Sequence, residues 1–456
     1  MPFPLNKVLN RLPGVALALT LALRMAPAAG GQAEQVPPAA TPVAITLEEA
    51  IHRAEANEPS FAAASAESRA SALDRSIARA GLLPGVTYHN QALYTEPNGL
   101  RNQGGQGAGS QPSPKFIANN AVREYASQAV VNETLGLGPL ATVRRADAEA
   151  ARAAAELEIA RRGLRVTVVG LFYGVLAAAN KLVVAQHAQS EASDFTGLTG
   201  KREQGREAAH ADVVKAQLAE QQRRRDLADA RLAADKARLE LGVLLFADPR
   251  TPYTLTARET PPLPSRAEVD AAAEKNNPEL KSALASLKVS DADVLAARGA
   301  YLPALGLNVT YGIDAPQVAA NGPDGVRNLG YSASVTLDIP VWDWLSTQHK
   351  VKQSVIRRDA AKVALSAAQR RLVARLDEAY AEAAAAEEQL GSLDASVTTA
   401  AESLRLTRLR YDAGEATVLE VVDAENANLG AENAREDGQV RARAARADLE
   451  TLTGTM

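Results

Sequence analysis

The chain has 456 residues, with 50 Lys and Arg against 54 Asp and Glu, and a formal net charge of −4. This balance argues against a polybasic face for nucleic acid. The absence of cysteine excludes disulfides, Cys-ligated metals and a lipid anchor through an N-terminal Cys. Aromatic residues make up only 4% of the chain, and its richness in Ala, Leu, Arg and Glu favours long helices over a compact mixed domain.

Residues 1–29 have the pattern of a secretory signal peptide. Lys7 and Arg11 precede an apolar run, and small residues place the cleavage site at Ala28 or Ala29. An uncleaved anchor is the alternative, but an apolar run of about ten residues is too short for a bilayer that needs roughly twenty. We expect an exported protein that begins with a linker over residues 30–45 and has no transmembrane helix.

The rest of the chain is an internal repeat, which we place at residues 46–246 and 265–456 with a Pro-rich linker at 247–264. The stretches "NEPSF" and "NNPEL" have Asn57 and Asn276, and Pro59 and Pro278, separated by the same 219 residues. Proline is tolerated in the first turn of a helix, so each stretch predicts a helix start. A period of this length indicates two copies of one structural unit.

Two strands are predicted in each copy, at residues 84–96 and 121–134 and at residues 303–313 and 329–339. In "LGLNVTYG" and "YSASVTLDI" apolar residues alternate with small or polar ones, which is typical of a barrel strand between lipid and water. A half-buried soluble sheet alternates in the same way. The long Gly-, Pro- and Asn-rich segments between the strands favour the barrel, because they resemble its outward-facing loops.

Proline-free stretches at residues 140–248 and 341–456 predict two helical hairpins, at 140–246 and 342–455. The hairpin turns are placed at Gly205 and Gly414, where glycine relieves backbone strain. Each hairpin then contains two helices of about fifty residues, or about 75 Å, which need coiled-coil partners.

Four strands are too few to close a membrane barrel, for which about eight is the minimum. Open sheet edges in lipid leave backbone groups without hydrogen bonds. Either the strands lie outside a membrane, or several chains share one barrel; three chains would give twelve strands and twelve long helices.

The doubled Asn-x-Pro helix, the Leu-Pro that opens a strand, "LDIPVWDWL" and "YDAGEATVLEVVDAE" resemble the TolC-like outer-membrane efflux proteins. The resemblance covers about Thr46 to Gly454. It implies a mainly α-helical fold with membrane β-structure: a homotrimer whose protomers each give four strands to a 12-stranded outer-membrane barrel, above a coiled-coil tunnel in the periplasm of a Gram-negative cell. It also implies a passive exit duct for efflux or type I secretion, with a periplasmic adaptor protein and an inner-membrane transporter as partners.

The resemblance further implies roles for particular residues. Glu420 and Asp423 match acidic positions that ring the periplasmic aperture, where charged rings select ions. Tyr411 and Asp212 match positions that hold the tunnel closed, although the family's nearby arginine is replaced by Ala416. The turns at Gly205 and Gly414 would contact the adaptor. For the acidic pair the alternative is an ordinary solvated helix face, and for the glycines it is a turn with no further role.

Trp342 and Trp344, the only two tryptophans, lie where the last strand leads into a helix. Indole rings favour the membrane interface, so these residues are candidate anchors on outer-membrane lipid. Packing of the helix N-terminus is an equal alternative.

No residues indicate catalysis, a cofactor or a metal. The histidines are scattered, and no Gly-rich phosphate loop, nucleophile elbow or acid pair at the end of a strand appears, so we do not expect an enzyme. A soluble periplasmic coiled-coil adaptor or scaffold protein is the alternative function, but such proteins usually carry one hairpin rather than two. The substrate, the partner pump and the resting state of the tip are left undetermined.

Overall fold

The computed structural model describes residues 42–94, 123–257, 262–315, 318–322, 325 and 327–454. The predicted signal peptide, the linker up to residue 41 and the long loop after Tyr94 lie outside these residues. From Val43 onward the chain forms one structural unit, built from two copies of the same element order. The first copy contains β1 (Val43–Thr46), α1 (Leu47–Asn57), α2 (Pro59–Ala80), β2 (Gly85–Tyr94), β3 (Arg123–Leu135), α3 (Leu137–Gln204) and α4 (His210–Leu245). The second contains β4 (Tyr253–Thr256), α5 (Arg266–Asn276), α6 (Pro278–Gly299), β5 (Ala304–Ala315), β6 (Leu329–Asp338), α7 (Ser346–Asp412) and α8 (Val418–Thr453).

The repeated prolines begin helices, as predicted. Pro59 and Pro278 are the first residues of α2 and α6. The residue before each proline ends the preceding short helix and caps the next: the Glu58 carboxylate accepts from the Phe61 amide at 2.8 Å, and the Asn277 side chain accepts from the Leu280 amide at 2.9 Å. The repeated motif is therefore a corner between two helices.

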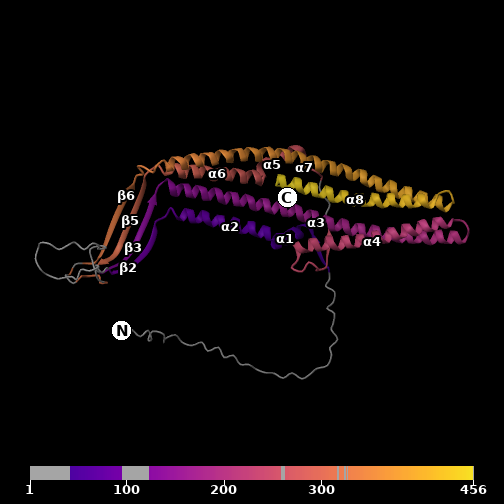
Figure 1. Ribbon diagram of the computed structural model, residues 1–456, viewed down its shortest axis with the longest axis horizontal. Helices are drawn as coiled ribbons and strands as arrows, with labels where there is room; N and C mark the ends of the chain where they lie inside the picture. Colours follow the sequence, from indigo (N-terminus) through magenta and orange to yellow (C-terminus); the bar gives the residue numbers. More distant parts are fainter. Residues whose placement is uncertain are drawn as a thin grey trace, which may run out of the picture. The chain divides into compact units, whose positions relative to one another are not determined.

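The hairpin helices are unequal, and the predicted length of about fifty residues for each was wrong. α3 and α7 have 68 and 67 residues, whereas α4 and α8 have 36 each. The reason is that each long helix has two partners in succession: α3 packs on α2 and then on α4, and α7 packs on α6 and then on α8. Figure 1 shows the sheet at one end of the helices and the two hairpin turns at the other.

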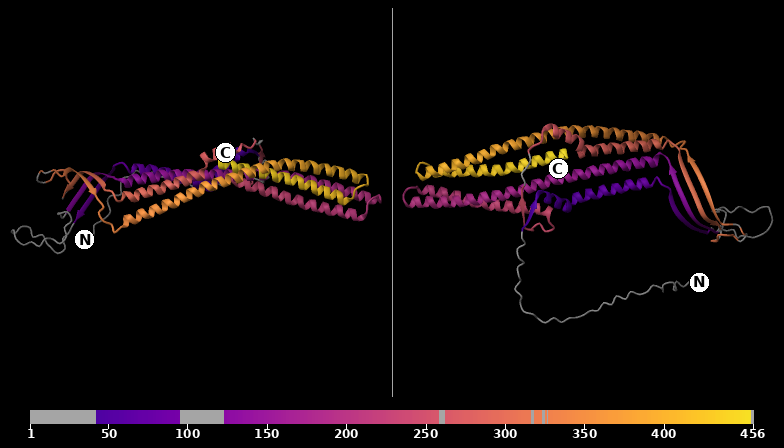
Figure 2. Two further views of the ribbon diagram at one scale, coloured as in Figure 1. Left: turned by 90° about the horizontal axis from the view of Figure 1, so that it is seen from above. Right: turned by 180° about the vertical axis from the view of Figure 1, so that it is seen from behind.

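The four barrel-type strands form one antiparallel sheet in the order β2-β3-β5-β6. The helices that adjoin the sheet follow the same order, with α2 and α7 at the outer edges and α3 and α6 between them (Figures 1 and 2). Within this sheet β2 and β6 each have one edge without a partner strand. At Gly312 the backbones of β3 and β5 approach so closely that a Cβ would collide with the Ser127 carbonyl oxygen, so only glycine fits there.

The predicted linker 247–264 contains structure that the sequence analysis missed. Its strand β4 pairs in parallel with β1, with Ile45 opposite Leu255. Ile45 and Tyr253 are buried there with Phe172 of α3 and Leu241 of α4. The linker between the two copies is thus part of a packed core at mid-length of the helices.

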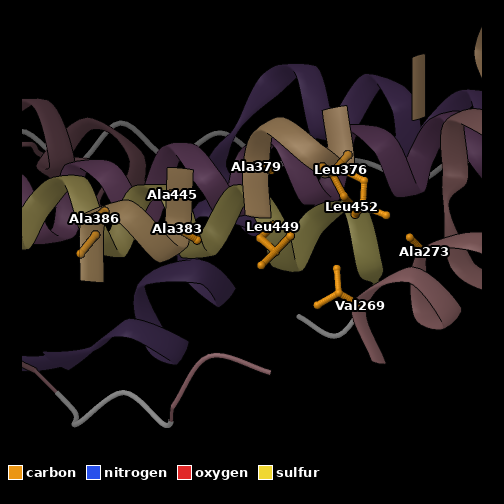
Figure 3. Packing of buried hydrophobic residues seen from close by; sticks show 10 residues of the cluster. Val269, Ala273, Leu376, Ala379, Ala383, Ala386, Ala445, Leu449 and Leu452 are labelled. Carbon is orange, nitrogen blue, oxygen red and sulfur yellow. The ribbon is translucent and has the colours of Figure 1, made fainter. Parts of the chain in front are cut away.

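A second core lies between α5, α7 and α8 (Figure 3). Alanines along α7 face alanines and leucines of α8, and Val269 of α5 closes the cluster at one end. Small side chains let the helix backbones approach closely, which explains why an alanine-rich chain forms these hairpins.

By length and composition, one helix among the described residues, α3, could cross a membrane, with a window of mean hydropathy 1.8. The sequence predicted no transmembrane helix. Val168 and Phe172 of α3 are buried in the core around β1 and β4, although only 28% of the apolar window is buried within the protomer.

Candidate functional site

The two faces of the four-stranded sheet differ in chemistry. Directly opposed residues of antiparallel strands share a face, so the register sorts the side chains. One face carries rows of apolar residues: Val86, Val131, Val309 and Ala333; Tyr88, Ala129, Tyr311 and Tyr331; and Leu135, Leu305 and Leu337. The other face is mainly polar or small and includes Thr87, His89, Gln91, Gln128, Asn132, Asn308, Thr310, Asp314, Ser332, Ser334 and Thr336.

Two polar residues on the apolar face are hydrogen-bonded to each other. The Ser127 hydroxyl donates to the Asn90 side-chain oxygen at 2.9 Å and lies 2.9 Å from the Tyr88 hydroxyl. Because these groups satisfy one another, they place little demand on water. These hydrogen-bonded side chains are therefore compatible with an apolar surrounding, whereas Glu133, opposite Leu307, places a charged residue on the same face near the end of β3.

The hairpin turns comprise residues 205–209 and 413–417, so both predicted glycines lie in turns, but at different positions. Gly205 and Ala413 end the long helices, and Ala209 and Thr417 precede the short ones, so both pairs are separated by 208 residues. The residue equivalent to Gly414 is thus Arg206. Gly414 has φ +80° and Arg206 has φ +65°, whereas Gly205 has an ordinary φ of −72°.

Glu420 is tied to the second turn. The Thr417 hydroxyl accepts from the Glu420 amide at 3.3 Å, and the Glu420 carboxylate accepts in return from the Thr417 amide at 3.3 Å. This is a capping box, which fixes the start of α8. Arg410 lies 3.4 Å from the same carboxylate. Asp423 lies one turn further along and is exposed, so both carboxylates lie on the same side of the helix start.

The first turn lacks this arrangement. Ala209, which is equivalent to Thr417, has no side-chain cap. Asp212, which is equivalent to Glu420, lies 3.8 Å from Lys215, the residue equivalent to Asp423. The positions of the two acidic residues of the second copy are therefore occupied by one acidic and one basic residue in the first copy.

Tyr411 is buried among four helices. Its ring contacts Phe195 of α3 at a centroid distance of 5.0 Å, and Ala216, Val418 and Val421 complete the cluster. Its hydroxyl lies 3.3 Å from the Thr199 hydroxyl. No hydrogen bond joins Tyr411 to Asp212 among the described residues of the protomer.

Sequence reasoning missed Arg202 and Thr199, the polar partners of Tyr411. Arg202 donates to the Tyr411 carbonyl oxygen at 2.7 Å, and its guanidinium lies 4.5 Å from the Tyr411 ring centroid. The repeat contained an indication: Arg202 and Arg410 are 208 residues apart, the separation that the turns have in the structure. An alignment anchored on Gly205 and Gly414 shifts this pair by one residue.

The two tryptophans project from the connection 339–345 between β6 and α7. Trp342 and Trp344 are 67% and 84% exposed, and their rings form an edge-to-face pair at 5.9 Å. Asp343 caps the helix by accepting from the Thr347 amide at 2.7 Å, and hydrogen bonding by Thr347 lowers the pKa of the Asp343 carboxyl. The aspartate, not the indoles, fixes the start of α7 in the protomer. In the first copy Gly136 alone forms this connection.

Among the described residues no group of three or more His, Asp and Glu side chains is arranged to hold a metal ion. Polar groups instead gather in two separate places: on one face of the sheet at one end of the helices, and at the acidic start of α8 at the other end. A sheet with one apolar and one mainly polar face, continued by long helical hairpins, is typical of the class of outer-membrane channel proteins.

Comparisons with known proteins find one matching family and several similar channels. Residues 271–455 match the family model of outer membrane efflux proteins. Protein CyaE of Bordetella pertussis is 26% identical over 401 residues, which cover 87% of this chain and 81% of CyaE. Outer membrane protein OprJ of Pseudomonas aeruginosa is 25% identical over 175 residues, or 38% of this chain and 36% of OprJ. The solved CmeC outer membrane channel of Campylobacter jejuni has a TM-score of 0.74 at 16% identity, over 90% of this chain and 85% of that one.

The match to the outer membrane efflux protein family covers residues 271–455, and the fold over 90% of the chain is that of the solved outer membrane channels, as the repeated motifs predicted. The matched family and the fold are those of transport channels.

Proposed function

We propose that three copies of the chain form a passive exit duct, with a 12-stranded barrel in the outer membrane and a helical tunnel in the periplasm. One observation carries the proposal: the sheet of one protomer has an apolar face and two edges, β2 and β6, without partner strands. In lipid such edges must be paired. Pairing β2 of each copy with β6 of the next satisfies them and joins α2 to α7 along the same seam.

The duct would work with a periplasmic adaptor protein and an inner-membrane transporter, which supply the contact at the hairpin turns and the energy for transport. Glu420 and Asp423 of three copies would place six carboxylates around the narrow end. A ring of like charge attracts ions of the opposite sign, so the duct would favour cationic or neutral solutes. Drug efflux and polypeptide secretion are both compatible with this arrangement.

Cysteine pairs test whether the barrel closes between copies, because the natural chain contains no cysteine. Thr87 on β2 is replaced by Cys together with Ser332, Ser334 or Thr336 on β6, all on the polar face. We expect one of these pairs to give covalent trimers on denaturing gels after mild oxidation of membranes.

Thr87→Cys with Thr310→Cys is the matched control, because β3 separates those strands within the protomer. Monomers from every β2–β6 pair, in a protein that is extracted without detergent, would instead support the soluble adaptor alternative.

A further inference from the structure

The turn of the second hairpin is attached to the first hairpin by a small set of side chains. Along most of their length the hairpins meet through α3 and α8. Near the turns the apolar contact is limited to the cluster around Tyr411, with Phe195 and Ala216 from the first hairpin and Val418 and Val421 from the second. A polar contact between the hairpins lies slightly earlier on α7, where Arg408 is 2.9 Å from Glu191 of α3. At the turn itself, the position of the end of α7 depends on one further polar side chain.

Arg202 on α3 is that side chain. It reaches across to the last turn of α7, where it donates to the carbonyl oxygens of Tyr411 at 2.7 Å and Asp412 at 3.1 Å. It also lies 3.4 Å from the Asp412 carboxylate and stacks over the Tyr411 ring. The Arg202 side chain is only 20% exposed. Its hydrogen bond to the Tyr411 carbonyl oxygen is partly buried, whereas its contacts with Asp412 are exposed.

The place where Arg202 binds explains why an arginine is suited to it. The last carbonyls of a helix have no partner within the helix, and they form the negative end of its dipole. A guanidinium offers several N–H groups in a rigid fork and can bridge two such carbonyls while stacking on an aromatic ring, which lysine cannot do. The Tyr411 carbonyl also accepts from the Gly414 amide at 3.0 Å, so Arg202 holds the same oxygen that closes the turn.

The repeat shows that this anchoring is one-sided. Arg410, the residue equivalent to Arg202, stays within its own hairpin and donates to the Glu415 carbonyl at 3.2 Å. Both arginines therefore act on the second turn. The first turn is instead bridged by two residues of its own hairpin: the His210 ring lies 2.7 Å from the Glu203 carboxylate. Of the two turns, the second is the one fixed to the other hairpin by an arginine.

We propose that Arg202 is a positioning residue for the aperture. By fixing the end of α7 on the first hairpin, it sets the place where α8 begins and hence where the carboxylates of Glu420 and Asp423 lie. Arg202 makes this contact from the first hairpin. Ala416, in the second turn, stands where the family has an arginine, and its methyl group cannot make such a contact. The aperture role of the two carboxylates rests on the proposed function; the anchoring of the turn does not.

Hydrogen–deuterium exchange of the detergent-solubilised full-length protein tests the anchoring directly. The amides of Ala413, Gly414 and Glu415 all donate within the second turn. In Arg202→Gln we expect them to exchange about tenfold faster, since the loss of charge-assisted hydrogen bonds makes local opening easier. Arg202→Lys keeps the charge without the fork, and we expect it to resemble Arg202→Gln more than the natural protein.

Arg405→Gln is the matched control. Arg405 lies on α7 near the same turn, but its ion pair is with Glu402 of the same helix, and it is exposed. We expect natural exchange rates in this variant. Unchanged exchange in Arg202→Gln would overturn the inference, and so would an Arg202→Lys variant that matches the natural protein, because a simple charge would then suffice.

Single-channel recordings in planar bilayers separate the inference from the proposed function. If the duct is as proposed, Arg202→Gln raises the conductance of the resting channel, whereas Arg405→Gln does not. Faster exchange with unchanged conductance would support the anchoring by Arg202 and contradict the aperture assignment of Glu420 and Asp423.

Discussion

Arg206 occupies a left-handed backbone conformation that its equivalent, Gly414, adopts without a side chain. In this region the conformational free energy of a residue with a Cβ is about 1 kcal/mol less favourable than that of glycine. We expect Arg206→Gly to raise the free energy of unfolding by about 0.5–1 kcal/mol, and Gly414→Arg to lower it by about 1–2 kcal/mol. Thermal unfolding in detergent measures both changes.

Gly205→Ala is the control for this pair, because the φ of Gly205 is −72° and a Cβ would lie 3.5 Å or more from its neighbours. The stability of this variant should not fall. A loss as large as that of Gly414→Arg would mean that Gly205 is the strained residue after all.

Tyr253 gives the protein a specific sensitivity to alkaline pH. Burial raises the pKa of Tyr253 to about 12, against an ordinary value of 10. Between these values the folded protein keeps a proton that the unfolded chain releases, so stability falls as the pH rises from about 10 toward 12. We expect Tyr253→Phe to be less stable at neutral pH, because it loses the hydrogen bond to the Arg238 carbonyl.

The same variant should lose stability less steeply above pH 10. Unfolding midpoints in denaturant, measured from pH 8 to pH 11 for both proteins, give the two slopes. Parallel curves would show that the Tyr253 hydroxyl does not control the alkaline response; the lysines titrate equally in both proteins and cancel in the comparison.

At the scale of elements, the connection 339–345 offers the clearest membrane contact. Val341, Trp342 and Trp344 are all highly exposed, and amphipathic indole rings favour the bilayer interface. The chain contains no other tryptophan, so intrinsic fluorescence reports on this connection alone. In liposomes we expect a blue-shifted emission that is quenched by lipids brominated near the headgroup.

Trp342→Phe and Trp344→Phe separate the two signals. Asp343→Ala tests whether the helix cap orients the indoles, and we expect weaker quenching in that variant. If the emission is that of tryptophan in water and no brominated lipid quenches it, the two tryptophans do not contact lipid, and the prediction is wrong.

At the scale of the whole molecule, the acidic start of α8 should set ion selectivity. In a trimer, Glu420→Gln with Asp423→Asn removes six negative charges from one ring. We expect the reversal potential in a salt gradient to shift toward zero, since the preference for cations depends on these charges. Glu402→Gln, which removes an exposed charge from α7, should leave the reversal potential unchanged.

Most of the fold followed from the sequence because two independent periodicities agreed. The Asn-x-Pro corner recurred at a fixed separation, and period-two alternation marked the strands, so the fold class and the family were predicted correctly. β4 escaped prediction because its four residues form a strand only through pairing with β1. The helix lengths were misjudged because a proline-free stretch does not show which partner a helix packs on.

The candidate site was predictable only where local chemistry decides it. The Thr417–Glu420 capping box lies within four consecutive residues, so a short motif contains it. Tyr411 was matched to a family position, but its partners Thr199 and Arg202 come from a helix about 210 residues away. Contacts of that kind depend on tertiary packing and cannot be derived from a local pattern.

The unequal connections between sheet and helices have a mechanical consequence. Gly136 ties α3 to the sheet through a single residue, whereas residues 339–345 separate β6 from α7. A rotation of the second hairpin can therefore be absorbed by torsions along the longer tether, while the short one transmits force rigidly. Strain applied at the far tips should bend this compliant joint first and leave the neighbouring strands of the sheet undisturbed.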